Sequence, residues 1–323
     1  MALQSSGQIK LSEIAAEYGG AVPHALSEYY GDGNAPGSGE IELATDFYGT
    51  SSGAAISGKS WSAGGNYPVS NGSTAGCGTV SAAMGWGHAE GSSSSYTYNG
   101  STWSSTAGLA TGIWQHDGCG TTSAALSIGG RIGGSQSTNC QEYNGSSWSS
   151  GGSLATGRRY TAGNGIQTDG LAVCGWGPSE STLTSCEEYN GSSWSSGGSF
   201  TSGGLAHWTA GISTSDCISG LSGVVRSYNG SSWSLETSTG TSRTGARGAG
   251  TTSSNALVIS GYGVSAGTKI TAVESYQGSS WTTENACSTE YTQGGRGGQA
   301  SNSAIKHSGY PNSGSTNVTE EYA

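Results

Sequence analysis

The chain has 323 residues, of which 59 are glycine and only 10% are charged, and its formal net charge is −10. No basic cluster could neutralise a run of phosphates, so nucleic acid is excluded as an expected ligand. Tryptophan and tyrosine (10 and 16) far outnumber phenylalanine (2), which argues against a disordered Gly/Ser linker and favours short strands with many turns.

The first 53 residues differ from the rest of the chain and predict a separate segment with short helices. A Ser or Thr N-cap beside an acid precedes a Tyr-Gly pair three times, at Ser12, Ser27 and Thr45. The N-terminus carries neither a charged leader nor an apolar stretch, and the chain has no run of eighteen apolar residues. We therefore expect synthesis in a cytoplasm, no signal peptide and no membrane insertion.

One hexapeptide organises residues 54–323. It reads Tyr-Asn-Gly-Ser-Ser/Thr-Trp, with Gln277 in place of Asn in its last copy. Because Asn-Gly accepts positive φ at both central turn positions, each copy predicts a tight type I′ β-hairpin. The five copies end at Trp103, Trp148, Trp194, Trp233 and Trp281.

The spacing of the copies predicts the blades of a β-propeller. Successive copies end 39 to 48 residues apart, which is the repeat length of propeller blades. A second column of glycines closes short apolar runs and predicts the end of a second strand in each blade. The column consists of Gly85, Gly130, Gly175, Gly220, Gly261 and Gly309.

The two ends of this region carry complementary halves of the hexapeptide. Trp61 lacks its Tyr, and the chain stops one residue after Tyr322. Joining the halves predicts a six-bladed ring whose last blade takes its outer strand from about residues 56–63 and the remainder from about 284–323. A right-handed β-helix or fibrous stack is the main alternative, and unfolded low-complexity sequence is a weaker one.

The repeated aromatic residues are interpreted as packing between blades rather than as a binding row. The same applies to Trp61 and Tyr322, and the seven cysteines are interpreted as small buried core residues. Exposed binding residues are instead expected directly after the column glycines, on the face opposite the hairpins. These are Trp86, Arg131, Trp176, Leu221, Tyr262 and Tyr310, four of them aromatic.

A cationic mouth on the same face is a further hypothesis. Arg158 and Arg159 lie in the predicted connections between blades, and acidic polysaccharide is the ligand that such a mouth would suit. The other members are His116, His207, Arg243, Arg247 and Arg296. Isolated arginines bonded to backbone are the competing interpretation.

No catalytic, metal-binding or cofactor-binding pattern emerges. The histidines lack the spacing of a zinc helix, and no cysteine pair has metal-ligand spacing. A propeller glycosidase would need two carboxylates in a central pocket, but Asp117, Asp169 and Asp216 lie in turn contexts that explain them structurally. The acidic pairs before the hairpin Tyr, such as Glu187-Glu188 and Glu320-Glu321, are interpreted as solvated edge charges. We expect a protein that is not an enzyme.

An apolar run followed by a glycine pair and then by Tyr and Trp resembles the kelch repeat. Ser127–Gly130 followed by Tyr143 and Trp148 is the closest copy, whereas Ser219-Gly220 and Ser260-Gly261 depart from the pattern. The Gly/Ser-rich repeats are similar to those of virion proteins of tailed, especially marine, bacteriophages. The phrase Ser-Gly-x-Ile-x-Leu, at Ser6 and again at Ser38, resembles the N-terminal segments of such proteins.

The resemblance implies a virion protein of a fibre, tail or head appendage, present in multiple copies per particle. Residues 1–53 would attach it to other virion proteins, and the free propeller face would adhere to a host-surface glycan or protein. The alternatives are a purely structural decoration or adaptor protein that contacts only virion subunits, and a cellular kelch-type interaction module.

Overall fold

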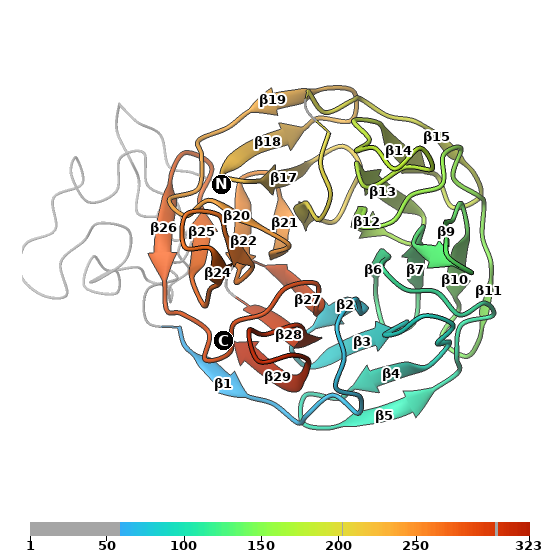
Figure 1. The fold of residues 1–323 in the computed structure, drawn as a ribbon, viewed down its shortest axis with the longest axis horizontal. Coiled ribbons are helices and arrows are strands. Elements are labelled where there is room, and N and C mark those ends of the chain that lie inside the picture. Colours follow the sequence, from blue (N-terminus) through green and yellow to red (C-terminus); the bar gives the residue numbers. More distant parts are fainter. Residues whose placement is uncertain (1–58, 202, 301–302) are drawn as a thin grey trace, which may run out of the picture. The chain divides into compact units, whose positions relative to one another are not determined.

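The computed structural model describes residues 59–201, 203–300 and 303–323. This part of the chain is all-β, contains no helix and has a propeller-like fold of four-stranded antiparallel sheets, which confirms the all-β part of the predicted fold class. Figure 1 shows the sheets arranged around a common axis. No helix long and apolar enough to cross a membrane occurs in it. The predicted helices of residues 1–53 lie outside the described residues.

Six sheets have four strands each among the described residues, and they follow one another along the chain. The first two contain β2 (Ala75–Thr79), β3 (Ala82–Trp86), β4 (Ser95–Tyr98) and β5 (Trp103–Thr106), then β6 (Asp117–Gly120), β7 (Ala125–Ile128), β10 (Cys140–Tyr143) and β11 (Trp148–Ser150). The next two contain β12 (Ala162–Ile166), β13 (Asp169–Val173), β14 (Cys186–Tyr189) and β15 (Trp194–Ser196), then β16 (Trp208–Gly211), β17 (Cys217–Leu221), β18 (Val224–Tyr228) and β19 (Trp233–Leu235).

The last two four-stranded sheets differ in how they are assembled. One contains β21 (Arg247–Thr252), β22 (Asn255–Ile259), β25 (Val273–Tyr276) and β26 (Trp281–Glu284). The other contains β27 (Gly295–Ala300), β28 (Ser303–Gly309), β29 (Thr316–Tyr322) and β1 (Trp61–Ala63). Short ribbons are added by β8 (Arg131–Ile132) with β9 (Ser135–Gln136), and by β20 (Arg243–Thr244), β23 (Tyr262–Gly263) and β24 (Thr268–Lys269).

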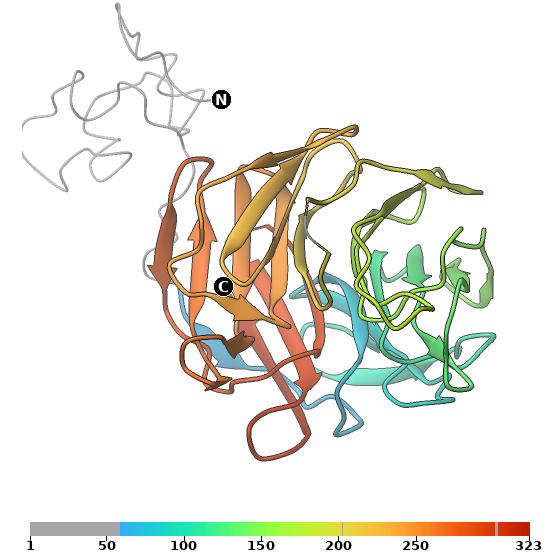
Figure 2. The ribbon, with the colours of Figure 1, turned by 45° about the horizontal axis from the view of Figure 1, so that its top comes forward.

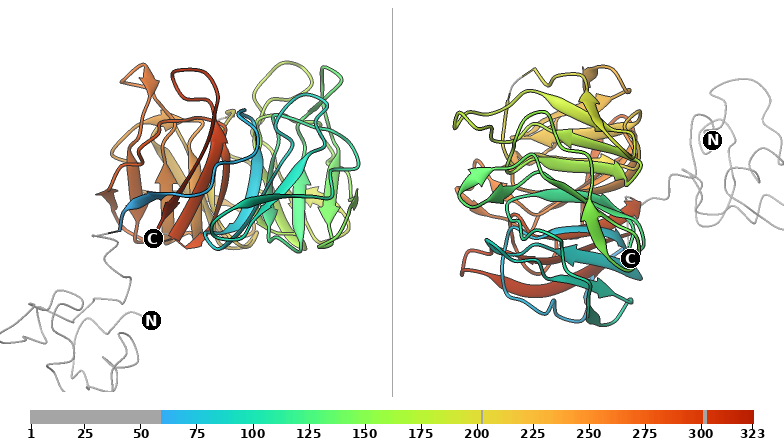
Figure 3. Two further views of the ribbon diagram at one scale, coloured as in Figure 1. Left: turned by 90° about the horizontal axis from the view of Figure 1, so that it is seen from below. Right: turned by 90° about the vertical axis from the view of Figure 1, so that its right-hand side faces the viewer.

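The innermost strands contact one another in a cycle. β2 contacts β6, β6 contacts β12, and the series continues through β16, β21 and β27 back to β2. We call the edge that carries the hexapeptide turns the hairpin face, and the edge that carries the long connections between sheets the loop face. Figure 3 shows the long connections at the edge opposite the C-terminus, and Figure 2 shows the connection from β28 to β29 extending beyond its sheet.

Each hexapeptide forms a hairpin with a four-residue loop rather than the predicted two-residue type I′ turn. Tyr98 pairs with Trp103, which leaves residues 99–102 in the loop. Only Gly100 has positive φ there, at 90°. The side-chain oxygen of Asn99 accepts hydrogen bonds from the backbone N–H groups of Ser101 and Thr102, at 3.0 and 2.8 Å. The type I′ prediction is therefore wrong, because the Asn side chain, and not a second positive φ, closes the turn.

The two half-motifs come together in one sheet. β1 pairs with β29 in a register that places Trp61 opposite Tyr322, as their sequence predicted. Their ring centroids are 5.2 Å apart, and the complete hexapeptide Tyr98–Trp103 gives 4.9 Å. The pair contributed by two distant segments therefore reproduces the pair made within one hexapeptide.

The tyrosine hydroxyls link each sheet to its neighbour. Tyr189 donates to Glu142, Tyr228 to Glu188, Tyr276 to Glu236 and Tyr322 to Glu284, at 2.5 to 3.0 Å. Tyr98 donates to Glu321, which joins the first four-stranded sheet to the last. The remaining member, Tyr143, bonds Thr106 at 2.7 Å.

The acidic pairs are therefore not the solvated edge charges that the sequence suggested. Glu187 and Glu320 are 4% and 1% exposed, because they form ion pairs with the buried Arg158 and Lys306. The second member of each pair, Glu188 or Glu321, accepts a tyrosine hydroxyl from the next sheet.

The apolar core lies between sheets, where the repeated aromatic residues pack. Trp148 is 7% exposed and contacts Trp86 and Tyr143, each with a ring-centroid distance of 5.2 Å. All seven cysteines are free thiols and buried, as their interpretation as core residues predicted.

We expect Trp148→Ala to lower the free energy of unfolding by about 3–5 kcal/mol, the usual cost of truncating a buried Trp. Trp176→Ala, at a partly exposed position on the loop face, should change it by less than about 1 kcal/mol. Denaturant titration of both variants measures the difference. Equal losses would contradict the division between core and face.

Candidate functional site

Four of the predicted surface residues do lie on the loop face, each in the connection that follows the second strand of a different four-stranded sheet. Arg131 pairs with Trp114, Trp176 with Arg159, Tyr262 with Thr244, and Tyr310 with Thr292, each partner being in the connection that precedes an innermost strand. Tyr262 is 41% exposed, and Arg131, Trp176 and Tyr310 are half-buried.

Trp86 is fully buried, so its prediction as an exposed binding residue is wrong. A series of left-handed residues, with φ between 51° and 61°, ends the second strand of each sheet: Gly87, Gly129, Cys174, Ser222, Ser260 and Ser308. Trp86 directly precedes the left-handed residue of its sheet, as Ile128 and Val173 do in theirs, and all three are the last residues of their strands. Leu221 is in the same position and is half-buried. The glycine column was thus misaligned at Gly85 and Gly220.

Arg158 is also fully buried, and its binding role is likewise wrong. Its guanidinium donates to the Glu187 carboxylate at 2.5 Å and to the backbone oxygens of Ser185 and Cys174, at 2.9 and 3.1 Å. Arg243 repeats this arrangement with Glu274. A buried guanidinium needs such partners because an unpaired buried charge is strongly unfavourable.

The remaining members of the predicted cationic mouth are also in the interior. His116, His207 and Arg247 are 3%, 1% and 6% exposed. Arg296 projects into the axis. Arg131 and Arg159 are partly accessible and lie on the loop face.

Backbone groups close the axis at the loop face. The residue that enters each innermost strand has positive φ, and the six are Ser73, Gln115, Tyr160, Ala206, Gly245 and Gln293. They are linked by backbone hydrogen bonds of 2.7 to 3.3 Å, in each of which an N–H group donates to the carbonyl of the preceding member: Tyr160 to Gln115, Ala206 to Tyr160, Gly245 to Ala206 and Gln293 to Gly245. All of these residues except Gly245 line a small pocket there.

Arg296 fills the axis nearer the hairpin face. The other innermost strands carry a residue without a long side chain at the matching position: Gly76, Gly118, Gly163, Thr209 and Gly248. Its guanidinium donates to the backbone oxygens of Gly163 and Thr209, at 2.6 and 2.7 Å, and to that of Gly248. Burial lowers the pKa of Arg296, and the carboxylate of Asp117, 3.9 Å away, opposes this effect.

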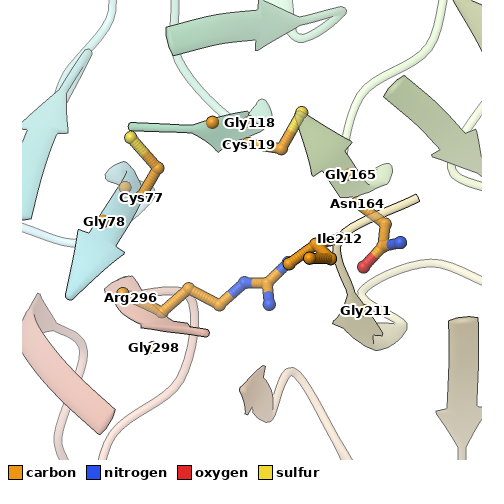
Figure 4. A pocket seen from close by; sticks show the side chains of 13 residues that line it. Cys77, Gly78, Gly118, Cys119, Asn164, Gly165, Gly211, Ile212, Arg296 and Gly298 are labelled. Carbon is orange, nitrogen blue, oxygen red and sulfur yellow. The ribbon is translucent and has the colours of Figure 1, made fainter. Parts of the chain in front are cut away.

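The space left beside Arg296 is a small cavity of about 40 Å³. Figure 4 shows the Arg296 side chain extended across it towards Asn164 and Ile212, with the thiols of Cys77 and Cys119 on the opposite side. Burial raises the pKa of Cys77 above its ordinary value, so the thiol stays protonated at neutral pH. This cavity has room for only a few water molecules.

A groove of about 560 Å³ lies on the loop face. Apolar contributions come from Leu205, Ala206, Leu221 and Tyr262, and polar groups come from Thr182, Thr244, Lys269, Thr292 and Gln293. A groove lined by an exposed aromatic ring, small apolar residues, and hydroxyl and amide groups is typical of a site for a sugar or a short peptide.

A second cluster lies beside the groove, around Arg159. The guanidinium of Arg159 is flanked by the rings of Tyr160 and Trp176, at 5.6 and 5.8 Å from its central carbon. It donates to Gln115 at 3.4 Å and to Glu180 at 3.1 Å. Thr182, which lines the groove, is two residues from Glu180 and pairs with Trp176. The two features therefore share one wall.

The candidate catalytic carboxylates are each held by a neighbouring sheet. Asp117 accepts the Gly163 N–H at 3.0 Å, Asp169 the Thr214 hydroxyl at 2.5 Å and Asp216 the Ser253 N–H at 2.8 Å. Within the described ranges, no three His, Cys, Asp or Glu side chains gather as a metal-binding group. These contacts favour a structural role for the three aspartates.

Comparison with known proteins gives a fold but no family. No protein-family model matches the chain, and no curated protein matches it. Solved structures do resemble it, among them the structure of YjhT, with a TM-score of 0.66 at 12% identity over 80% of this chain and 96% of that one. At this identity the likeness shows the fold alone.

Sequence reasoning missed the axial role of Arg296 and the contacts of Glu180. A signal for the first exists, because Gly-Arg-Gly-Gly at 295–298 aligns with Ala-Gly-Cys-Gly at 75–78 and places Arg where the other strand has glycine. No local pattern singles out Glu180, which lies in an irregular loop.

Proposed function

We propose that the chain is a six-bladed, kelch-like propeller closed by its two ends, and that it serves as a non-enzymatic adhesion protein on a bacteriophage particle. The ring is supported by the contact between β27 and β2, by the pairing of β1 with β29 and by the bond from Tyr98 to Glu321. The virion assignment depends on the sequence resemblance, and its anchor, residues 1–53, lies outside the described residues.

The observation that carries the binding function is the groove on the loop face, with Tyr262 exposed at its rim. A rigid aromatic ring provides apolar area for a pyranose face at little cost in conformational entropy, and the neighbouring threonines and Gln293 offer hydrogen bonds to sugar hydroxyls. A host-surface glycan is therefore the ligand class that the groove fits best.

Tyr262→Ala should weaken attachment of the full-length protein to host cells or to isolated envelope glycan about tenfold, because it removes the stacking surface. Leu235→Ala is the matched control, since Leu235 is 67% exposed on β19, outside the groove. Equilibrium binding of fluorescently labelled protein measures both. Attachment that is insensitive to Tyr262, or absent, would instead support the alternative of a decoration protein that contacts only virion subunits.

A further inference from the structure

Glu180 lies in a tight turn on the loop face in a conformation that a glutamate rarely adopts. Its φ is 51°, in the left-handed region, and its side chain is 63% exposed. Its N–H donates to the Gly177 carbonyl at 3.1 Å. The turn therefore holds a solvent-accessible carboxylate at a backbone position of modest strain.

Three donors from three segments converge on this one carboxylate. Gln136 donates its amide N–H to Oε1 at 2.8 Å, and Oε2 accepts from the Trp176 indole at 2.8 Å and from the Arg159 guanidinium at 3.1 Å. These bonds, that of Gln136 first, lower the pKa of Glu180. A carboxylate-binding site typically provides donors to both oxygens, with an arginine among them, and this site has that arrangement.

Arg159 keeps its position through contacts other than that with Glu180. Arg159 is held between the rings of Tyr160 and Trp176 and also reaches Gln115, and its side chain is only 18% exposed. Its buried Nε has no hydrogen-bond partner in the described structure. The site would thus persist if the glutamate moved away, because Arg159 is already desolvated and oriented.

The surroundings favour an acidic sugar as the external ligand. Trp176 and Tyr160 offer ring faces beside the guanidinium, and the glycan-sized groove reaches Thr182, two residues from Glu180. The whole chain carries a net charge of −10, so an anionic glycan needs a local cation, and Glu180 neutralises Arg159 in the free protein.

We propose that Glu180 occupies a carboxylate-binding site whose external ligand is the uronate group of an acidic host-surface glycan. This inference rests on the glycan-binding function proposed above and specifies its ligand class. The ligand carboxylate replaces that of Glu180 on Arg159, Trp176 and Gln136, while the adjoining sugar rings extend into the groove.

The test compares tetragalacturonate with its methyl ester, which has the same rings without the negative charges, by calorimetric titration of the full-length protein. Glu180→Ala should bind the acid at least about tenfold more tightly than wild type does, because the competing carboxylate is gone, and should bind the ester with unchanged affinity. Arg159→Ala should lose the preference for the acid. Glu90→Ala, which removes the same charge from another exposed position, is the matched control and should behave as wild type.

Equal affinities of Glu180→Ala for acid and ester, or a gain matched by Glu90→Ala, would overturn the inference. Failure of the acid to bind any variant would overturn it as well. If host cells were nevertheless bound in a Tyr262-dependent manner, the proposed adhesion function would stand and only the uronate site would fall. A Trp176 indole resonance that shifts on addition of the acid, but not of the ester, gives a second readout of replacement at the site.

Discussion

Acidification from pH 7 to pH 4.5 should unfold the protein or lower its melting temperature by well over ten degrees. Three histidines cause this effect, because they are buried in neutral form. Burial lowers the pKa of His116 and His207 to about 4 and that of His307 to about 3. Arg247 lowers the pKa of His116 and His307 further, while Asp117 partly offsets this at His116.

The loss of stability at low pH follows from the difference in proton binding between the folded and unfolded chain. Between the folded pKa values near 3–4 and the ordinary value near 6.5, the unfolded chain binds more protons than the folded one, so stability falls as the pH decreases. Each pKa unit corresponds to about 1.4 kcal/mol of unfolding free energy. Each histidine therefore lowers the stability by on the order of 3 kcal/mol once the pH has fallen from its ordinary pKa to its folded pKa. The sum is comparable with the whole stability of a typical domain.

Melting temperatures between pH 8 and pH 4 measure the effect. His307→Phe should flatten the curve below pH 6.5, because an apolar ring at the same place keeps the contacts with Tyr67 and Trp103. His88→Phe is the control, since His88 is only half-buried and should change the slope less. A melting temperature that stays constant from pH 7 to pH 4.5 would show that these imidazoles are not buried in neutral form.

Replacement of the axial arginine should be strongly destabilising. Arg296→Met keeps much of the side-chain length but leaves the Gly163, Thr209 and Gly248 carbonyls without their charged donor. It also removes the positive charge beside Asp117, which is 2% exposed. Loss of one partner from such a buried arrangement costs about 3–5 kcal/mol in unfolding free energy.

Denaturant titration of Arg296→Met, Asp117→Asn and the double variant tests whether the charge is the cause. The double variant should be more stable than the sum of the two single losses implies, with a coupling of at least about 1 kcal/mol. Additive losses would mean that Arg296 stabilises the axis by its carbonyl contacts alone. A loss below about 1 kcal/mol for Arg296→Met would contradict its role at the axis altogether.

The sequence predicted the repeat well, since each hexapeptide acts through near neighbours. The Tyr and Trp of each copy are five positions apart and face each other across one hairpin, so their pairing depends on local turn chemistry. The pairing of Trp61 with Tyr322 was predicted in the same way, because each lies in one strand of an incomplete hairpin and the two strands complement each other. The turn type was wrong since the Asn side chain competes with the backbone for the loop N–H groups.

The binding residues were predicted less well because exposure depends on distant segments. Trp86 and Trp176 both follow a glycine, yet the first packs on Trp148 of the next sheet and the second lies on the loop face. Arg158 and Arg159 are adjacent in the chain, but Arg158 forms a buried ion pair with Glu187, whereas Arg159 forms an ion pair with the exposed Glu180.

The sequence by itself determined the repeat and the strand partners within each hexapeptide hairpin, because these depend on turn residues and contacts over a few positions. Only the tertiary structure decided which side chain fills the axis, which charges are buried in pairs and which donors converge on Glu180. These outcomes depend on contacts between sheets, where residues 20 to more than 100 positions apart occupy the same desolvated space, so a pattern within one repeat does not determine the contacts that its side chains make.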